Sequence, residues 1–240
     1  MMSSSQSSDF AFQKPSIERA WKDFIKHFPA LCVAWVLAFI VYLGGIIVLY
    51  FCLYLGLFLD ILHYGTNGPE GPLTILGLIV GLFGGAPLWL VFSTLLAMIF
   101  AIPAMYYNGG EERVTAKKAF NELNRRRIRY IFAGVFHTAM MLLGYMLCFL
   151  PGLIIAMLGP IYINKIFLTD QSILEAFNSS FRSVFGSRDW PYFLLISFLG
   201  GLIVALSSLL TCNVGYFITC PMYAFYIQNY AYHKGILSKV

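Results

Sequence analysis

Charged residues are scarce in this sequence, at 11% of the chain. A soluble globular domain carries roughly 25% charged residues. The 59% of apolar residues would also leave a soluble domain of this length with an aggregation-prone surface. The composition therefore excludes an ordinary soluble protein and predicts an integral membrane protein. The 22 Phe and 15 Tyr fit this class, because aromatic side chains suit lipid-facing and interfacial positions.

Recognisable catalytic motifs are missing as well. The sequence contains no G-x-S-x-G, no H-E-x-x-H and no phosphate-binding loop. Its five cysteines lie in apolar segments and form no C-x-x-C pair. His137 is the one ionisable residue well inside an apolar segment. It could act as a proton relay or ligand, or its ring could simply be hydrogen-bonded to a nearby carbonyl. We therefore expect that the protein is not an enzyme and that it has no cofactor and no metal site.

Basic residues gather in only four places along the chain, at 14–26, 113–129, 165–188 and 234–239. Cytoplasmic loops of membrane proteins carry the excess of Lys and Arg. The sequence therefore predicts that both termini and the two basic loops are cytoplasmic. Because this asymmetry already has a topological cause, nucleic-acid binding is not expected.

One six-residue pattern, [Ser/Thr]-x-x-x-Ala-[Trp/Phe], occurs three times, at residues 16–21, 115–120 and 172–177. Each copy starts a short amphipathic helix with its apolar side chains on one face, and each leads into a long apolar segment. We expect these helices to lie at the cytoplasmic membrane surface. Their predicted interfacial anchors are the aromatic residues of the pattern, Trp21, Phe120 and Phe177.

A proline precedes the predicted cytoplasmic end of each returning apolar segment, at Pro103, Pro160 and Pro221. Proline removes one helical hydrogen bond and crowds the preceding turn, so each is a predicted helix kink. The sequence thus predicts an all-α integral membrane protein with six transmembrane helices. They form three repeats of interfacial helix, outgoing helix and Pro-kinked returning helix, with both termini cytoplasmic. The predicted modules are residues 16–107, 115–168 and 172–232.

Residues 14–235 are predicted to form a single membrane domain, between a disordered tail at 1–13 and a short tail at 236–240. The first module is longer than two crossings require, since about 20 residues cross a bilayer. Its surplus, about 50–87, is an outer elaboration made of extended helices or of a re-entrant pair. Gly77, Gly81 and Gly85 share one helix face there and predict close packing, within the chain or against a second copy.

The middle basic loop holds the densest cluster of positive charge. Near a membrane surface, the attraction between each Lys or Arg and anionic lipid contributes about 1 kcal/mol to the free energy of binding. Topological anchoring alone explains the same residues equally well. The candidate anionic-lipid contacts are Lys117, Lys118, Arg125, Arg126, Arg127 and Arg129.

The three copies of the pattern, with Pro-Met-Tyr at 221–223, carry a family resemblance. The chain resembles bacterial multi-pass membrane proteins of unknown function, related to the membrane domain fused to some glycerophosphodiester phosphodiesterases. The resemblance implies a six-span protein of the bacterial inner membrane, and no catalytic residue carries over. We expect a non-enzymatic protein that organises membrane lipids or a partner, either a second copy or another membrane protein. The alternative is a transporter or flippase-like permease for an apolar or zwitterionic cargo.

Overall fold

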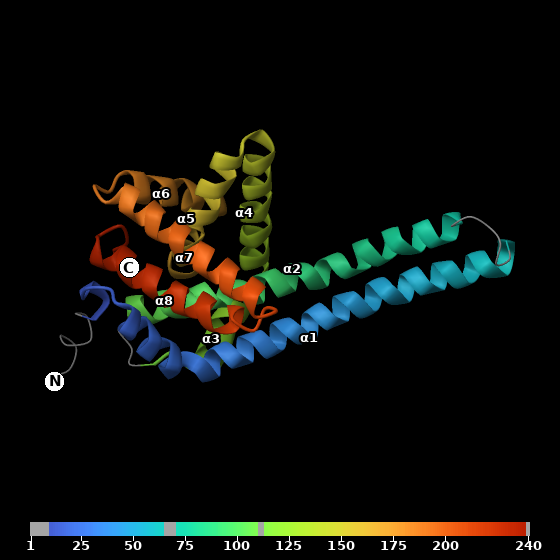
Figure 1. Cartoon of the computed structure of the whole chain (residues 1–240), viewed down its shortest axis with the longest axis horizontal. Helices are drawn as coiled ribbons and strands as arrows, with labels where there is room; N and C mark the ends of the chain where they lie inside the picture. Colours follow the sequence, from blue (N-terminus) through green and yellow to red (C-terminus); the bar gives the residue numbers. More distant parts are fainter. Residues whose placement is uncertain (1–9, 65–70, 110–112, 239–240) are drawn as a thin grey trace. The chain divides into compact units, whose positions relative to one another are not determined.

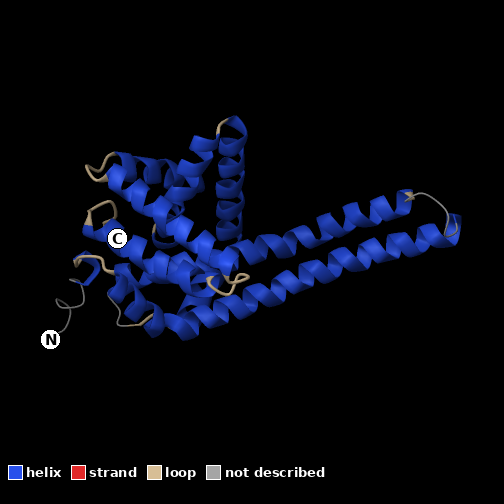
Figure 2. Cartoon of the chain, in the orientation of Figure 1, coloured by secondary structure: helices blue, strands red, loops and turns tan. Residues whose placement is uncertain are grey.

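A computed structural model describes residues 10–64, 71–109 and 113–238, and within these ranges the chain is helical without strands (Figures 1 and 2). The short 3-10 helix η1 (Phe10–Phe12) precedes two long helices, α1 (Ile17–Tyr64) and α2 (Pro72–Gly109). Six shorter helices follow. They are α3 (Ala116–Arg125), α4 (Arg127–Leu147), α5 (Phe149–Leu168), α6 (Ile173–Phe185), α7 (Trp190–Leu210) and α8 (Tyr216–His233).

Four helical stretches are long and apolar enough to cross a membrane, counting only the described residues. They are Ile17–His63, Arg127–Leu147, Phe149–Leu168 and Trp190–Leu210. A shorter apolar stretch is Pro72–Ala86. This indicates a helical membrane protein, as the composition predicts. Helix α8 is less apolar, because its second half carries buried polar side chains such as Gln228 and Asn229.

The chain divides into two compact units, and α1 and α2 each contribute residues to both. The first unit comprises residues 1–34 and 97–240, and the second comprises residues 35–96. The second unit contains only the apolar parts of α1 and α2 and their connection. It includes the whole of the predicted elaboration at 50–87, where residues 50–64 and 72–87 belong to these two helices.

Inside the second unit, glycines let α1 and α2 approach closely. A Cβ atom on Gly77 would lie only 2.4 Å from the carbonyl O of Cys52, and one on Gly81 would lie 2.9 Å from the carbonyl O of Leu49. Gly85 is buried as well. The glycine spacing therefore serves a contact within the chain. Asp60 of α1 accepts hydrogen bonds from the backbone N–H of two residues that begin α2, Leu73 at 3.2 Å and Thr74 at 2.6 Å.

The first unit is built around α5, which packs against α4, α6, α7 and α8. Helices α4 and α5 form one hairpin, with only Cys148 between them, and α7 and α8 form another. The buried core draws on α5, on the end of α2 and on the second half of α8. Ile102, Ile161 and Ile227 are fully buried there.

The three copies of the six-residue pattern begin with the same local structure. The side-chain oxygens of Ser16, Thr115 and Ser172 each accept a hydrogen bond from the backbone N–H three residues later, at 3.2–3.3 Å. This contact caps a helix N-terminus. The alanine of each copy is buried, at Ala20, Ala119 and Ala176.

The third copy adds a full capping box at the start of α6. Glu175 accepts a hydrogen bond from the backbone N–H of Ser172 at 2.8 Å, which lowers the pKa of the Glu175 carboxyl. The first copy differs in another way. Helix α1 continues through Pro29 without a break, so the predicted first interfacial helix is the start of a longer helix. Pro29 removes a single backbone donor, and a packed helix can tolerate that loss.

Both chain ends pack more than the sequence predicts. The side-chain N–H of Asn229 donates to the carbonyl O of Ala11 at 2.8 Å, and the His233 ring lies 2.7 Å from the carbonyl O of Phe12. Residues 10–13, which the sequence assigns to a disordered tail, contact α8 through these bonds, while residues 1–9 lie outside the described ranges. Ile236 is buried too, although a tail was predicted from this residue onward. Apolar side chains in these segments favour docking onto the helices over exposure to water.

Candidate functional site

Several charges of the middle basic loop bond within the chain, and four residues of the predicted set are exposed. Arg125 pairs with Glu122 at 2.7 Å, and Arg126 pairs with Asp170, which lowers the pKa of the Asp170 carboxyl. Arg129 donates to the carbonyl oxygens of Thr169 and Gln171, at 3.0 and 2.6 Å, and so ties α4 to the α5–α6 connection. The exposed members of the predicted set are Lys117, Lys118, Arg125 and Arg127.

The three predicted aromatic anchors have different surroundings. Trp21 and Phe120 are 45% and 49% exposed, so both present their rings to the exterior of the first unit. Phe177 is only 8% exposed and packs edge-to-face against Phe136 and Tyr162. Two of the predicted anchors are thus exposed, whereas Phe177 joins α6 to the α4–α5 hairpin.

The three predicted kink prolines are buried inside helices of the first unit. Pro103 lies in α2, Pro160 in α5 and Pro221 in α8. The carbonyl O of Pro160 accepts a hydrogen bond from the Gln228 side chain at 2.7 Å, and Gln228 in turn accepts one from Asn164 at 3.0 Å. These buried amides therefore link α5 and α8 next to a proline.

A second buried polar cluster joins α1 to the end of α2. The Asp23 carboxylate accepts hydrogen bonds from the hydroxyls of Tyr106 at 3.2 Å and Tyr107 at 2.7 Å. The Nδ1 atom of His27 lies 2.8 Å from the carbonyl O of Asp23, and its ring packs against Tyr106 and Phe225. Aromatic rings fill the space around this cluster. Its hydrogen bonds and ring contacts hold α1 against the end of α2.

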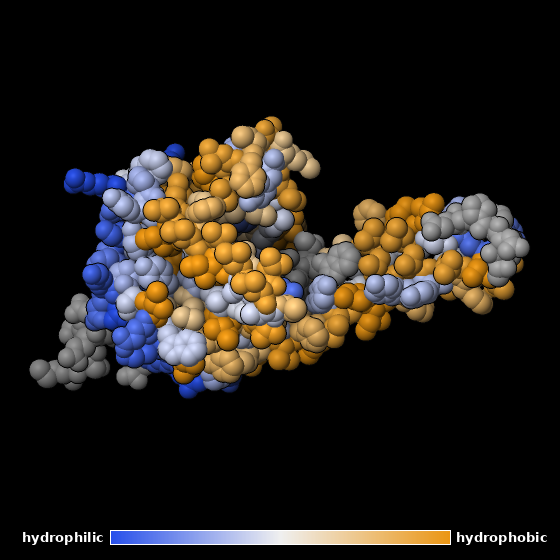
Figure 3. Space-filling view, in the orientation of Figure 1, coloured by the Kyte–Doolittle hydropathy of each residue, from blue (hydrophilic) through white to orange (hydrophobic). Residues whose placement is uncertain are grey.

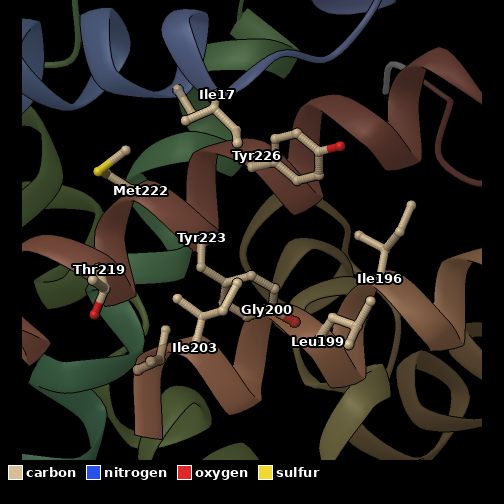
Figure 4. A pocket seen from close by; sticks show the side chains of 11 residues that line it. Ile17, Ile196, Leu199, Gly200, Ile203, Thr219, Met222, Tyr223 and Tyr226 are labelled. Carbon is tan, nitrogen blue, oxygen red and sulfur yellow. The ribbon is translucent and has the colours of Figure 1, made fainter. Parts of the chain in front are cut away.

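An apolar cavity of about 330 Å³ lies between α7, α8 and the first turn of α1 (Figure 4). We call it the first cavity. Its walls include Ile17 from α1, Leu199 and Ile203 from α7, and Met222 and Tyr226 from α8. Ile203 and Leu199 are largely exposed, so the cavity opens along the outer side of α7. Its span along α7, from residue 196 to 204, is roughly 12 Å at 1.5 Å per residue.

A second cavity, of about 420 Å³, lies between α4, α5, α7 and α8, and Phe100 of α2 also lines it. Gly159 and Pro160 of α5 and Gly201 of α7 line it, together with Ser197 and His137. The Nε2 atom of His137 lies 3.2 Å from the carbonyl O of Ile155, and the ring stacks on Tyr162. A carbonyl only accepts, so this nitrogen carries the hydrogen, in keeping with the structural alternative for His137.

Tyr223 of α8 lines both cavities. Its ring lies against Gly200 of α7, where a Cβ atom would come within 2.4 Å of the ring. Its hydroxyl lies 3.4 Å from the carbonyl O of Ser197. The ring therefore lies between the two cavities and borders both of them.

The surface of the first unit is segregated by polarity. On the face drawn in Figure 3, hydrophilic residues gather at the end where α8 finishes, and hydrophobic residues cover α4, α5 and α7. The residues that line the two cavities carry no formal charge outside the His137 ring. The site can therefore hold hydrocarbon and offers little to acid–base chemistry.

Among the residues that line the cavities, sequence reasoning singles out His137, Pro160 and Tyr223, the last as part of Pro-Met-Tyr at 221–223, and it misses the others. The sequence does offer one signal for a close helix contact here. Gly200 and Gly201, with Ser197 one turn earlier, are small residues on an apolar helix. No signal in the sequence predicts that Ile17 lies beside Tyr226, because the two are distant in the chain.

The comparisons with known proteins add no relative. No family model, no curated protein and no solved structure matches this chain.

Proposed function

We propose that this chain is a non-enzymatic, multi-pass protein of the bacterial inner membrane that binds membrane lipids. The observation that carries the proposal is the first cavity, an apolar cleft of about 330 Å³ along α7 and α8. Clefts of roughly 300–1,000 Å³ with apolar walls are typical ligand sites. In a bilayer, a cleft that opens beside exposed residues such as Ile203 faces acyl chains.

The proposal includes six transmembrane helices in three repeats, with both termini cytoplasmic. Three observations support it: the shared helix caps at Ser16, Thr115 and Ser172, the buried alanine of each copy, and the clustering of Lys and Arg. The resemblance to bacterial multi-pass membrane proteins points the same way. In this arrangement the exposed side chains of Lys117, Lys118 and Arg127 meet the headgroups of anionic lipids.

Filling the first cavity tests the acyl-chain part of the proposal. Ile203→Trp places an indole in the cleft, and we expect about one phospholipid fewer retained per chain in native mass spectrometry. Leu206→Trp is the matched control, because Leu206 is exposed on the same helix and lines neither cavity. Equal lipid retention by the wild type and both variants would contradict lipid binding in this cleft.

Removing the exposed charges of the middle loop tests the headgroup part. We expect the triple change Lys117→Gln, Lys118→Gln and Arg127→Gln to weaken selection of anionic over zwitterionic lipid by at least about tenfold. Competition between the two lipids in native mass spectrometry measures this selection. The charge-matched control changes three other exposed residues to Gln: Lys14, Arg182 and Arg188. If the control variant loses as much selection, net charge alone accounts for the effect.

A second candidate function is lipid or apolar-cargo movement by a permease. It is favoured by the position of Tyr223, whose ring lines both cavities. Tyr223→Ala would join them into a longer cleft and raise the rate at which a fluorescent phospholipid changes leaflet in proteoliposomes. An unchanged rate in this variant, with no flipping above protein-free vesicles by the wild type, favours static lipid binding.

A further inference from the structure

The second cavity differs from the first in containing an unusual polar group. Ser197 of α7 is only 3% exposed, and its hydroxyl has no hydrogen-bond partner among the described residues. A serine inside a helix normally bonds to the carbonyl three or four residues earlier. Ser207 on the same helix does so, at 2.9 Å from the carbonyl O of Val204. The Ser197 hydroxyl is therefore a buried donor left for something that enters the cavity.

Apart from Ser197, the His137 ring and Tyr223, the described walls of the second cavity suit a hydrocarbon. Leu153, Met157 and Ile163 of α5 face Phe198 and Leu202 of α7 across it. No Lys, Arg, Asp or Glu is among its lining residues, and a charged group in such surroundings is strongly disfavoured. The shape and chemistry thus fit a long apolar molecule with a single uncharged polar group.

The cavity can be reached from the side of the helix bundle. Phe198, Gly201 and Leu202 are exposed on α7 and also line the cavity. A Cβ atom on Gly201 would meet no other atom within 4 Å. The opening therefore lies at a gap in the apolar surface of α7, where a molecule dissolved in the membrane can enter.

We propose that the second cavity binds a neutral lipid whose hydroxyl or carbonyl oxygen accepts the hydrogen of the Ser197 hydroxyl. The chain of this lipid lies between α5 and α7, and its oxygen reaches past Gly201 to Ser197. The inference rests on the proposed lipid-binding function and adds the class of lipid and the residue that recognises it.

Photolabelling in nanodiscs tests this assignment. The probe is a long-chain fatty alcohol that carries a diazirine on its chain, and the labelled peptides are identified by mass spectrometry. We expect label within residues 153–163 and 197–205. We also expect 1-dodecanol to compete about 5–10-fold better than dodecane, since the alkane cannot accept the hydrogen bond. Equal competition by dodecanol and dodecane in the wild-type protein would overturn the role of Ser197.

Three variants complete the test. Ser197→Ala should keep the labelling and abolish the preference for dodecanol. Gly201→Leu should block labelling by filling the opening. Gly134→Leu adds the same bulk on α4, where a Cβ atom also meets nothing within 4 Å, and should label like the wild type. Labelling that persists in Gly201→Leu, or that follows self-association of the chain, would overturn the proposed occupant.

A separate readout distinguishes this inference from the proposed function. A diazirine-bearing phospholipid should label the first cavity near Ile203 whether or not the alcohol binds the second. Phospholipid labelling there without any alcohol labelling would contradict the neutral-lipid site alone. Absence of both labels would contradict the proposed function as well.

Discussion

The two helical hairpins of the first unit pack in different ways. In the α4–α5 hairpin the backbones touch, because a Cβ atom on Gly144 would lie 2.7 Å from the backbone N of Gly152. In the α7–α8 hairpin the close contact at Gly200 is made by the Tyr223 side chain, at 2.4 Å from such a Cβ atom. The contact at Gly144 joins two backbones, and the contact at Gly200 joins a backbone to a ring. Near the turn of the α7–α8 hairpin, a Cβ atom on Gly215 would also lie 2.7 Å from the carbonyl O of Ser207.

This difference explains where a guest molecule can bind. Contact between the backbones at Gly144 and Gly152 leaves no space for a guest molecule between α4 and α5 at that point. The Tyr223 ring lies between α7 and α8 at Gly200, and it lines both cavities. In lipid, close backbone contact through small residues is a main source of helix association. At Gly200 the α7–α8 hairpin has a ring contact in place of a backbone contact, and the cavities beside the ring offer space for ligands.

The largest expected effect is on the α4–α5 hairpin. Gly144→Ala places a methyl group against the backbone of Gly152, which cannot move aside without separating the helices. We expect a loss of about 2 kcal/mol in the free energy of unfolding. Unfolding in a titration of SDS into mixed micelles, followed by circular dichroism, measures this loss.

Gly134→Ala is the internal control for that result. The residue lies on the same helix, and a Cβ atom there meets nothing within 4 Å. We expect the unfolding free energy to stay the same or to rise by up to about 1 kcal/mol, because alanine favours the helix. Equal losses at Gly134 and Gly144 would mean that an added methyl group destabilises α4 wherever it is placed, and that the contact with Gly152 is not the cause.

A smaller effect is expected in the α7–α8 hairpin, although the overlap is numerically tighter. Gly200→Ala pushes against the Tyr223 ring, which can turn into either cavity. We expect a loss below about 1 kcal/mol in the same SDS titration, together with weaker lipid retention. A loss as large as that of Gly144→Ala would show that Tyr223 is fixed and would remove the contrast between the hairpins.

Much of the helical architecture could be predicted from the sequence. The apolar composition indicates a membrane protein, and the four candidate spans agree with it. The start of α6 was marked by Ser172 and Glu175 at capping-box spacing. Such features depend on residues a few positions apart, so a local pattern is enough to find them.

Features that depend on distant residues could not be predicted. Phe120 and Phe177 occupy the same position of the repeated pattern, yet only Phe177 is buried, because α4 and α5 happen to cover it. The continuation of α1 through Pro29 and the docking of residues 10–13 onto α8 likewise depend on tertiary packing. The cavities follow the same rule, since each is lined by segments far apart in the chain.

A density map of the full chain in lipid nanodiscs tests the central claim most directly. The account predicts elongated density along α7 in the first cavity, beside Ile203 and Tyr226, and none between the backbones of Gly144 and Gly152. A map in which α7 and α8 close on each other, with the cavity filled by their own side chains, would contradict it.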